Sequence, residues 1–192
     1  ITGSSGLLGL NLCELFKNKF NITGIYNDSK PVIKEIDLVK IDIREINSCK
    51  TKISKIKPNI VIHCAAITDM DLCEINQKLA YDVNIKGTKN ILESINENCH
   101  FIFISTDNVY NNKRHFNDEN ADKNIINVYG DSKLKAEALV ANHRTNFTIL
   151  RTNFFGQDLS GKGSGLFHFI FDNLYMEKTV NLFHDVFFTP IS

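Results

Sequence analysis

The chain has 192 residues, of which 43% are hydrophobic and 23% charged, with 22 basic and 22 acidic side chains. This length fits one domain, and the balanced charge does not predict a nucleic-acid-binding surface. No apolar run reaches the ~20 residues of a membrane span, and five scattered cysteines without paired spacing predict reduced thiols in a cytoplasmic protein with no metal centre.

The ends of the sequence predict an internal fragment of a longer protein. Ile1 and Thr2 stand directly before a glycine-rich segment, as though most of a first strand had been removed, and residues 189–192 contain no terminal element. We expect a nucleotide-binding domain over residues 1–155. Residues 156–192 would be the truncated start of a substrate-binding region, most of which is missing.

Predicted strands and helices alternate along the chain. The first half contains a helix after the glycine segment, strands over 21–26 and 36–41, a helix over 44–56 ended by Pro58, and an apolar strand over 60–66. The second half contains a helix over 77–96, a strand over 101–105, a polar loop over 111–124, a helix that starts near Tyr129, a strand over 147–151 and a helix over 166–175. This order predicts an α/β, Rossmann-type doubly wound parallel sheet with helices on both faces and ligands beyond the carboxyl ends of the strands.

The glycine-rich segment has glycines at positions 3, 6 and 9 between a strand and an amphipathic helix. Such a loop allows a tight turn and close backbone approach to a pyrophosphate, while the helix N-terminus favours the anion. The GxxGxxG spacing after Thr2 resembles the short-chain dehydrogenase/reductase superfamily, in particular its extended members. The resemblance implies cofactor contacts from Gly3, Ser5, Gly6, Leu7, Leu8 and Gly9.

The tip of the second strand predicts the choice of cofactor. In the resembled family an acidic residue there holds the ribose of NAD, but this chain has Tyr26, followed by Asn27. A carboxylate that would repel a 2′-phosphate is missing at that position, and Asp28 comes two residues later. We therefore expect NADP(H) to be favoured, with NAD(H) as the alternative.

Two further segments resemble the parts of the family that contact the cofactor. Asp42 and Ile43 match an acidic-apolar pair that edges the adenine, with a solvated turn carboxylate as the alternative for Asp42. Cys64, Ala65 and Ala66 match an Asn-Ala-Ala segment where small residues let the strand end approach the cofactor. Because cysteine replaces the usual residue, only the backbone role is expected there, and core packing is the alternative.

Tyr129 and Lys133 lie four residues apart at the start of a predicted helix, so they share one face. A nearby ammonium stabilises a phenolate, which predicts a lowered phenol pKa and general acid-base chemistry. Tyr26 and Lys30 have the same spacing, but Pro31 disfavours a helix there. The resemblance implies that Tyr129 is the proton donor and that Lys133 also holds the nicotinamide ribose.

The remaining catalytic candidates are a strand-end hydroxyl and a helical amide. Thr106 follows the strand over 101–105, where a hydroxyl can orient a substrate carbonyl, with polar capping as the alternative. Asn84 matches a family helix signature in which asparagine supports the active site. His63, His100 and His115 show no metal or nucleophile spacing, so we interpret them as structural or surface residues.

The finer resemblance is to dTDP-4-dehydrorhamnose reductase and its sugar-nucleotide relatives. Segments 67–74, 105–107, 128–133 and 150–156 look like that family's Thr-x-x-Asp-x-x-Glu, Ser-Thr-Asp, Tyr-Gly-x-x-Lys and Arg-Thr-Ser-Trp motifs. The resemblance implies substrate contacts from Thr68, Thr106, Asp107 and Phe154. Phe154 stands where the family often has Trp.

The resemblance therefore implies hydride transfer from the nicotinamide to C4 of a 4-keto-6-deoxy sugar nucleotide. Two other functions stay open: a non-catalytic NADP-binding regulatory subunit like the β subunit of methionine adenosyltransferase, and a sugar-nucleotide epimerase or dehydratase. The expected partner is a sugar nucleotide, without nucleic acid or membrane, and a homodimer is left open. The sugar and its nucleotide base are not specified, and we expect residues 1–192 alone to have little or no activity.

Overall fold

The computed structural model describes residues 1–110, 117–161, 165–182 and 190–191. The strands are β1 (Thr23–Tyr26), β2 (Asp37–Lys40), β3 (Ile60–His63), β4 (His100–Ser105), β5 (Phe147–Arg151), β6 (Asn153–Phe154) and β7 (Pro190–Ile191). The helices are α1 (Leu7–Phe16), α2 (Ile46–Ile56), α3 (Met70–Ile75), α4 (Gln77–Tyr81), α5 (Thr88–Leu92), α6 (Val128–His143) and α7 (Leu166–Tyr175), with a π-helical segment η1 (Asp82–Gly87) and a 3-10 turn η2 (Asp107–Val109). Residues 111–116 of the predicted polar loop, including His115, lie outside the described residues.

The main sheet is parallel throughout its described strands. β2 pairs with β1, and β3, β4 and β5 pair in that order. Thr2 joins the two groups because it forms parallel bridges to both Ile25 and His63. The resulting order across the sheet is β2, β1, Thr2, β3, β4, β5. On either side of Thr2, successive strands are added in opposite directions across the sheet, so the glycine loop lies at the switch point of a doubly wound sheet.

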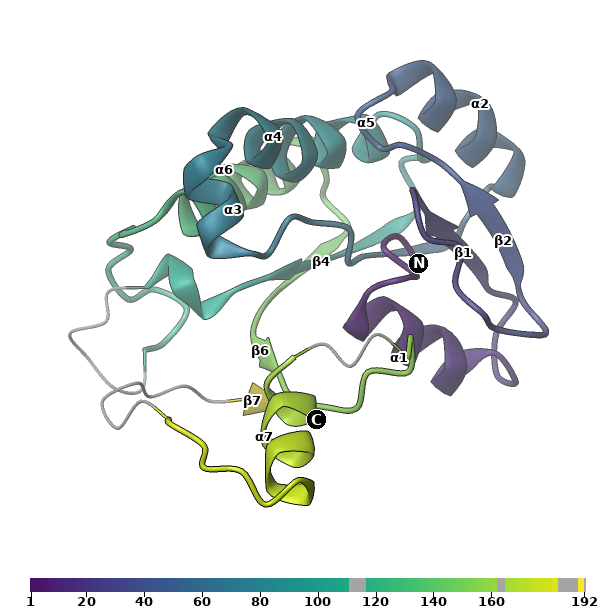
Figure 1. The fold of residues 1–192 in the computed structure, drawn as a ribbon. Coiled ribbons are helices and arrows are strands. Elements are labelled where there is room, and N and C mark those ends of the chain that lie inside the picture. The colour runs from purple at the N-terminus through teal and green to yellow at the C-terminus, as the bar shows by residue number, and fades with distance from the viewer. Residues whose placement is uncertain (111–116, 162–164, 183–189, 192) are drawn as a thin grey trace.

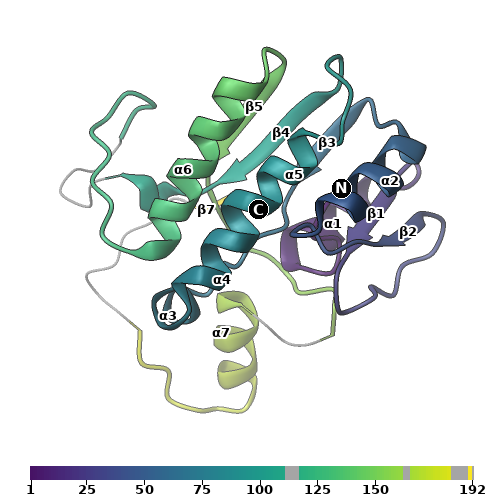
Figure 2. The same ribbon diagram turned by 90° about the horizontal axis from the view of Figure 1, so that it is seen from above.

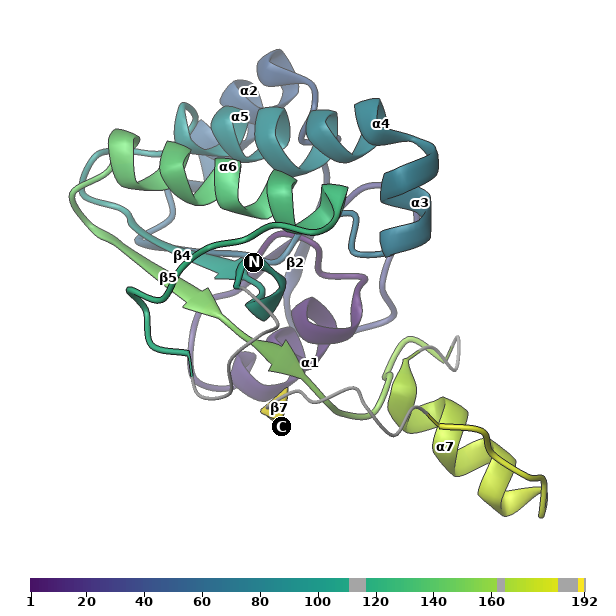
Figure 3. The same ribbon diagram turned by 90° about the vertical axis from the view of Figure 1, so that its left-hand side faces the viewer.

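Helices cover both faces of this sheet, as the sequence predicts. Figures 1 and 3 show α2, α4, α5 and α6 above the strands and α1 below them. Seen from above in Figure 2, the line formed by α4 and α5 runs beside α6. Parallel strands need such helical crossovers, which shield both faces from water. The predicted Rossmann-type α/β fold is therefore confirmed.

The core lies between the sheet and the layer of α2, α5 and α6. Phe101 and Phe103 of β4 are fully buried there, together with Ile91 and Leu92 of α5. Burial of each such side chain stabilises the fold by about 1.5–3 kcal/mol relative to exposure. This packing fixes β4, whose carboxyl end carries Thr106.

The helix predicted over 77–96 differs from the observed one in two respects. It ends at Leu92, and residues 82–87 in its middle form the π-helical segment η1. A π-helical turn contains one extra residue relative to an α-helical turn, so it rotates the side chains that follow, and such turns are frequent at functional sites. Periodicity along the sequence does not reveal this insertion.

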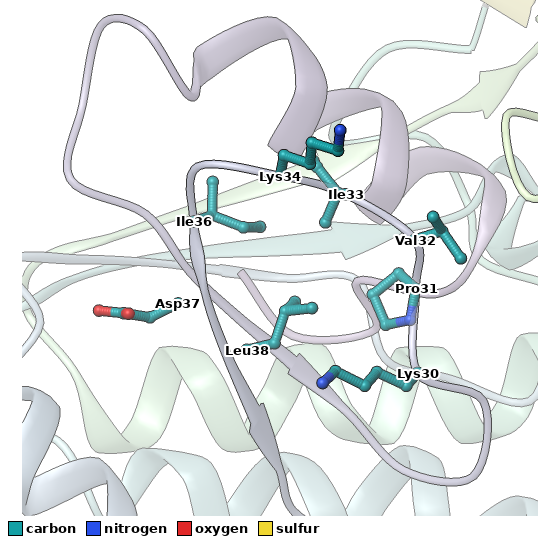
Figure 4. A pocket seen from close by; sticks show the side chains of 8 residues that line it. All are labelled: Lys30, Pro31, Val32, Ile33, Lys34, Ile36, Asp37 and Leu38. Carbon is teal, nitrogen blue, oxygen red and sulfur yellow. The ribbon is translucent and has the colours of Figure 1, made fainter.

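Two features lie outside the main sheet. β6 and β7 form a short parallel pair, and α7 stands away from the sheet (Figure 3). The connection between β1 and β2 forms an open hollow, in which Figure 4 shows Lys30 and Lys34 on opposite sides of Pro31.

In the part of the chain that the structure describes, no helix has the length and apolar character that a membrane crossing requires.

Candidate active site

The glycine loop is packed so tightly that two of its glycines leave no room for a side chain. Gly3 has φ +67°, and a Cβ there would lie 2.8 Å from the backbone nitrogen of Ala65. A Cβ on Gly9 would lie 2.2 Å from the carbonyl oxygen of Gly3. These glycines therefore allow α1 and the end of β3 to approach the loop backbone closely.

The start of α1 fits the pyrophosphate of a dinucleotide. Its N-cap is Gly6, which has no side chain to accept a hydrogen bond from the N–H groups of the first turn, and that turn contains no acidic residue. These N–H groups and the helix dipole favour an anion. Ser5 lies in the loop and Leu7 and Leu8 in this first turn, and their contacts with a cofactor stay a prediction.

The tip of β1 carries a charged cluster that includes an unpredicted arginine. Tyr26 ends β1, and the Asn27 amide donates a 3.0 Å hydrogen bond to Asp28. The Arg44 guanidinium donates to both carboxylate oxygens of Asp42, at 2.9 and 2.6 Å, and lowers the pKa of that carboxyl. The hydrogen bond to Asp42 raises the pKa of Arg44, and the charge of Asp28 contributes to this shift.

The two segments expected to contact the cofactor differ from each other in burial. Ile43 is buried, and a Cβ on Gly87 would lie 2.6 Å from its side chain, so Ile43 packs in the core and its contact with an adenine stays a prediction. Cys64, Ala65 and Ala66 follow β3 directly and are partly exposed. Burial raises the pKa of the Cys64 thiol to about 12, which keeps the thiol neutral.

Tyr129 meets Thr106 because the first turn of α6 packs against the carboxyl end of β4. The Asn127 side chain caps α6 by accepting a 2.7 Å hydrogen bond from the Gly130 N–H. A Cβ on Gly130 would lie 2.7 Å from the carbonyl oxygen of Asn108, so only glycine allows this approach. Thr106 is buried and accepts a hydrogen bond from the Asn108 N–H at 3.2 Å.

The phenol of Tyr129 does not have the lowered pKa that the lysine spacing predicts. Burial raises the pKa to about 12, a hydrogen bond with Thr106 opposes this shift, and the charges of Asp107 and Cys73 add to it. Lys133 is not among the groups that act on this phenol. The prediction of a lysine-lowered pKa is therefore wrong for this structure, in which desolvation keeps the phenol protonated.

Lys133 is buried beside the strand ends. Its ammonium lies 4.1 Å from the ring centroid of Phe103, and only 3% of the residue is exposed. Burial lowers the pKa of this lysine to about 7, while the charges of Cys64 and Glu137 oppose the shift. A shift of this size at a strand end is typical of a functional site.

Asn84 supports the site through neighbouring residues. Its amide oxygen accepts from the Ile67 N–H at 2.8 Å, and its amide nitrogen donates to the Ile67 carbonyl at 3.0 Å and to the Ser132 hydroxyl at 2.8 Å. Ser132 directly precedes Lys133 on α6. The π-helical turn thus presents an amide that joins the segment after β3 to α6.

The predicted substrate residues differ in their exposure and contacts. Thr68 is exposed, and Phe154 in β6 is partly exposed. Asp107 accepts a 2.6 Å hydrogen bond from Asn153, a contact that the sequence did not indicate. Glu74, from the predicted motif over 67–74, accepts from the N–H of Val128 at 2.7 Å and so holds the start of α6.

A buried ion pair behind Thr106 joins α6 to β4 and β5. Glu137 accepts a 2.5 Å hydrogen bond from Ser105 and lies 2.7 Å from the Arg151 guanidinium. Arg151 also donates to the Tyr110 hydroxyl at 2.9 Å. Sequence reasoning gave Glu137 no role, because nothing in the pattern along the helix shows that it faces a buried cation.

Similarity to known proteins agrees with this geometry. The RmlD substrate binding domain family matches residues 1–192. The chain is 27% identical over 188 residues to methionine adenosyltransferase 2 subunit beta from Xenopus tropicalis, covering 96% of this chain and 55% of that protein. It is 30% identical over 162 residues to dTDP-4-dehydrorhamnose reductase from Aggregatibacter actinomycetemcomitans, covering 82% and 51%.

A solved structure shares the fold at similar sequence identity. The crystal structure of dTDP-4-dehydrorhamnose reductase from Bacillus anthracis in complex with NADP superposes with a TM-score of 0.63 at 28% identity, covering 82% of this chain and 55% of that chain. The present chain thus spans about half the length of the curated relatives it matches. Because the family match extends over the whole sequence, the chain belongs to the RmlD substrate binding domain family.

Proposed function

We propose that the protein reduces the C4 carbonyl of a 4-keto-6-deoxy sugar nucleotide with NADPH. The observation that carries this proposal is the hydrogen bond between Tyr129 and Thr106 at the carboxyl end of β4, with Lys133 buried one helical turn along α6. Two of the relatives described above are named dTDP-4-dehydrorhamnose reductase, which supports the substrate class.

The side chains of the site support the reducing direction. When bound, NADPH supplies the hydride. Because its pKa is raised to about 12, the Tyr129 phenol carries a proton at neutral pH and can donate it to the carbonyl oxygen. The Thr106 hydroxyl orients that oxygen. Lys133, one helical turn along α6, would hold the nicotinamide ribose.

The glycine loop and α1 would hold the pyrophosphate, and the tip of β1 would hold the adenosine ribose. Tyr26 and Asn27 carry no carboxylate, Asp28 follows them, and the charge of Asp28 acts on the Arg44 guanidinium. A guanidinium binds phosphate oxygens in a fork-like geometry. These features support NADPH over NADH, and the partly exposed Arg44–Asp42 pair would exchange part of its contact for the 2′-phosphate.

The proposal is tested by turnover of dTDP-4-dehydrorhamnose in the full-length protein. We expect Tyr129→Phe to lower kcat by at least about 100-fold, the usual contribution of a positioned proton donor, and to leave NADPH affinity unchanged. Tyr81→Phe is the matched control, since it also removes a phenol hydroxyl with a hydrogen bond, the 2.7 Å bond to Asp131. Full activity of Tyr129→Phe would disprove the mechanism, and product without net NADPH consumption would indicate an epimerase.

A regulatory subunit is the second candidate, because the similarity to methionine adenosyltransferase 2 subunit beta covers 96% of the chain. In this function the dinucleotide site would be retained without turnover, and the protein would bind a methionine adenosyltransferase catalytic subunit. Gel filtration of the full-length protein with that subunit separates the two functions. Stable association together with absent reductase activity would favour regulation, and the opposite pattern would favour the reductase.

A further inference from the structure

A buried chain of hydrogen bonds runs from the glycine loop to the π-helical turn through His63. The Ala65 N–H lies 3.1 Å from the Thr2 hydroxyl, and that hydroxyl lies 2.8 Å from Nδ1 of His63. On the other side of the ring, Nε2 lies 3.1 Å from the Thr88 hydroxyl, which donates to the Asn84 carbonyl at 2.6 Å.

The Asn84 carbonyl determines the direction of the bonds on the Nε2 side of the ring, and a neutral ring then determines the bond on the Nδ1 side. A backbone N–H can only donate, so Thr2 accepts from Ala65, and a carbonyl can only accept, so Thr88 donates to Asn84. The Thr88 oxygen is then the acceptor for a proton on Nε2 of His63. Nδ1 must be unprotonated, and it accepts the hydroxyl hydrogen of Thr2.

The geometry therefore selects one neutral tautomer of His63. A protonated ring would direct an N–H at the Thr2 hydroxyl, whose own hydrogen would lose its acceptor. Thr2, His63, Asn84 and Thr88 are each at most 1% exposed, so water cannot replace a lost partner. Burial also lowers the pKa of His63 to about 3, in agreement with a ring that stays neutral.

The chain of bonds connects two parts of the proposed site that are distant in sequence. Thr2 precedes Gly3, the first glycine of the loop, and holds the Ala65 backbone against it. At the other end, Asn84 positions Ile67 and Ser132, the neighbour of Lys133. Thr88 and His63 belong neither to the glycine loop nor to the proposed catalytic trio. Their hydrogen bonds connect the loop to Asn84.

We propose that His63 is a positioning residue that couples the dinucleotide loop to the helix carrying Asn84, by hydrogen bonds that require its neutral Nε2–H form. This inference rests on the proposed dinucleotide site, but it does not depend on which sugar is reduced. Loss of the coupling loosens the loop relative to α6. Dinucleotide affinity then falls even when the altered residue lies far from the dinucleotide.

The test replaces Thr88, because valine has the shape of threonine without its hydroxyl and serine keeps the hydroxyl. Thr88→Val removes the hydroxyl, whereas Thr88→Ser keeps it, and Thr51→Val makes the same exchange at an exposed position. NADPH affinity is measured by titration of the full-length protein. The protonated nitrogen of His63 and the amide signals of Thr2 and Ala65 are measured by nitrogen-15 NMR.

We expect the proton on Nε2 in the wild type, shifted Thr2 and Ala65 amide signals in Thr88→Val, and a roughly 3- to 10-fold loss of NADPH affinity, the equivalent of one hydrogen bond. Thr88→Ser should behave as the wild type. A proton on Nδ1, or unchanged amides and affinity in Thr88→Val, would overturn the inference. A wild type that binds NADPH but reduces no sugar nucleotide would refute the proposed function and leave the coupling result intact.

Discussion

Two lysines each follow a tyrosine by four residues, yet they occupy opposite environments. Lys133 is 3% exposed on α6 with its ammonium above Phe103, and burial lowers its pKa to about 7. Lys30 is exposed in the connection after β1, beside Pro31 at the open hollow. The spacing is identical, so the difference shows that desolvation, rather than sequence separation, sets the pKa of a lysine.

Matched lysine replacements should give the largest contrast between the two regions. We expect Lys133→Met to lower kcat by at least about 100-fold, because the nicotinamide ribose loses the ammonium proposed to hold it in place. Lys30→Met should change kcat little and act on the KM for NADPH, if it acts at all. Steady-state kinetics with both variants tests this, and equal kcat losses would contradict the comparison.

The ion pairs of the two regions should also differ in their contribution to stability. The Glu137–Arg151 pair is nearly buried, with side chains 5% and 16% exposed, whereas Asp42 and Arg44 are 27% and 37% exposed. Glu137→Gln should lower the free energy of unfolding by about 3 kcal/mol, because it leaves a desolvated guanidinium without its counter-charge. Asp42→Asn should cost less than about 1 kcal/mol. Urea unfolding compares them, and similar losses would show that water screens both pairs alike.

The buried lysine should make stability depend on pH. The pKa of Lys133 is lower in the folded protein than in the unfolded chain, so the unfolded state binds more protons between about pH 7 and 10.5. The penalty for burying this lysine is full below pH 7 and decreases as pH rises. From pH 7 to about 8.5, wild type should gain up to about 1.4 kcal/mol per pH unit relative to Lys133→Met. If the difference in unfolding free energy between wild type and Lys133→Met stays constant with pH, the Lys133 ammonium is solvated in the folded state.

The smallest effect is expected at the tip of β1. Arg44→Ala should lower the affinity for NADPH by roughly 3- to 10-fold, because a partly exposed contact with the 2′-phosphate contributes about 1 kcal/mol to binding. NADH affinity should be unchanged, since NADH lacks the 2′-phosphate. Parallel titrations with both dinucleotides measure the ratio, and equal losses would show that Arg44 does not select the cofactor.

Many elements could be predicted because their signals are local. The helix over 166–175 and the strand over 147–151 match α7 and β5 in their bounds, and β1 to β4 are found with ends shifted by one to three residues. The π-helical turn and the short helix α3 were not predicted. Neither leaves a periodic pattern, because the first is a single inserted residue and the second is only six residues long.

The sequence by itself determined the order of strands and helices and the glycine loop, because glycine spacing and apolar runs are properties of neighbouring residues. For the same reason the i, i+4 pair was enough to predict Tyr129 and Lys133 as catalytic residues. Tertiary structure alone decided the rest. The pKa of Tyr129 rises instead of falling, His63 joins the loop to Asn84, and Glu137 meets Arg151. Desolvation and long-range hydrogen bonds depend on which distant residues pack together, and a linear pattern does not contain that information.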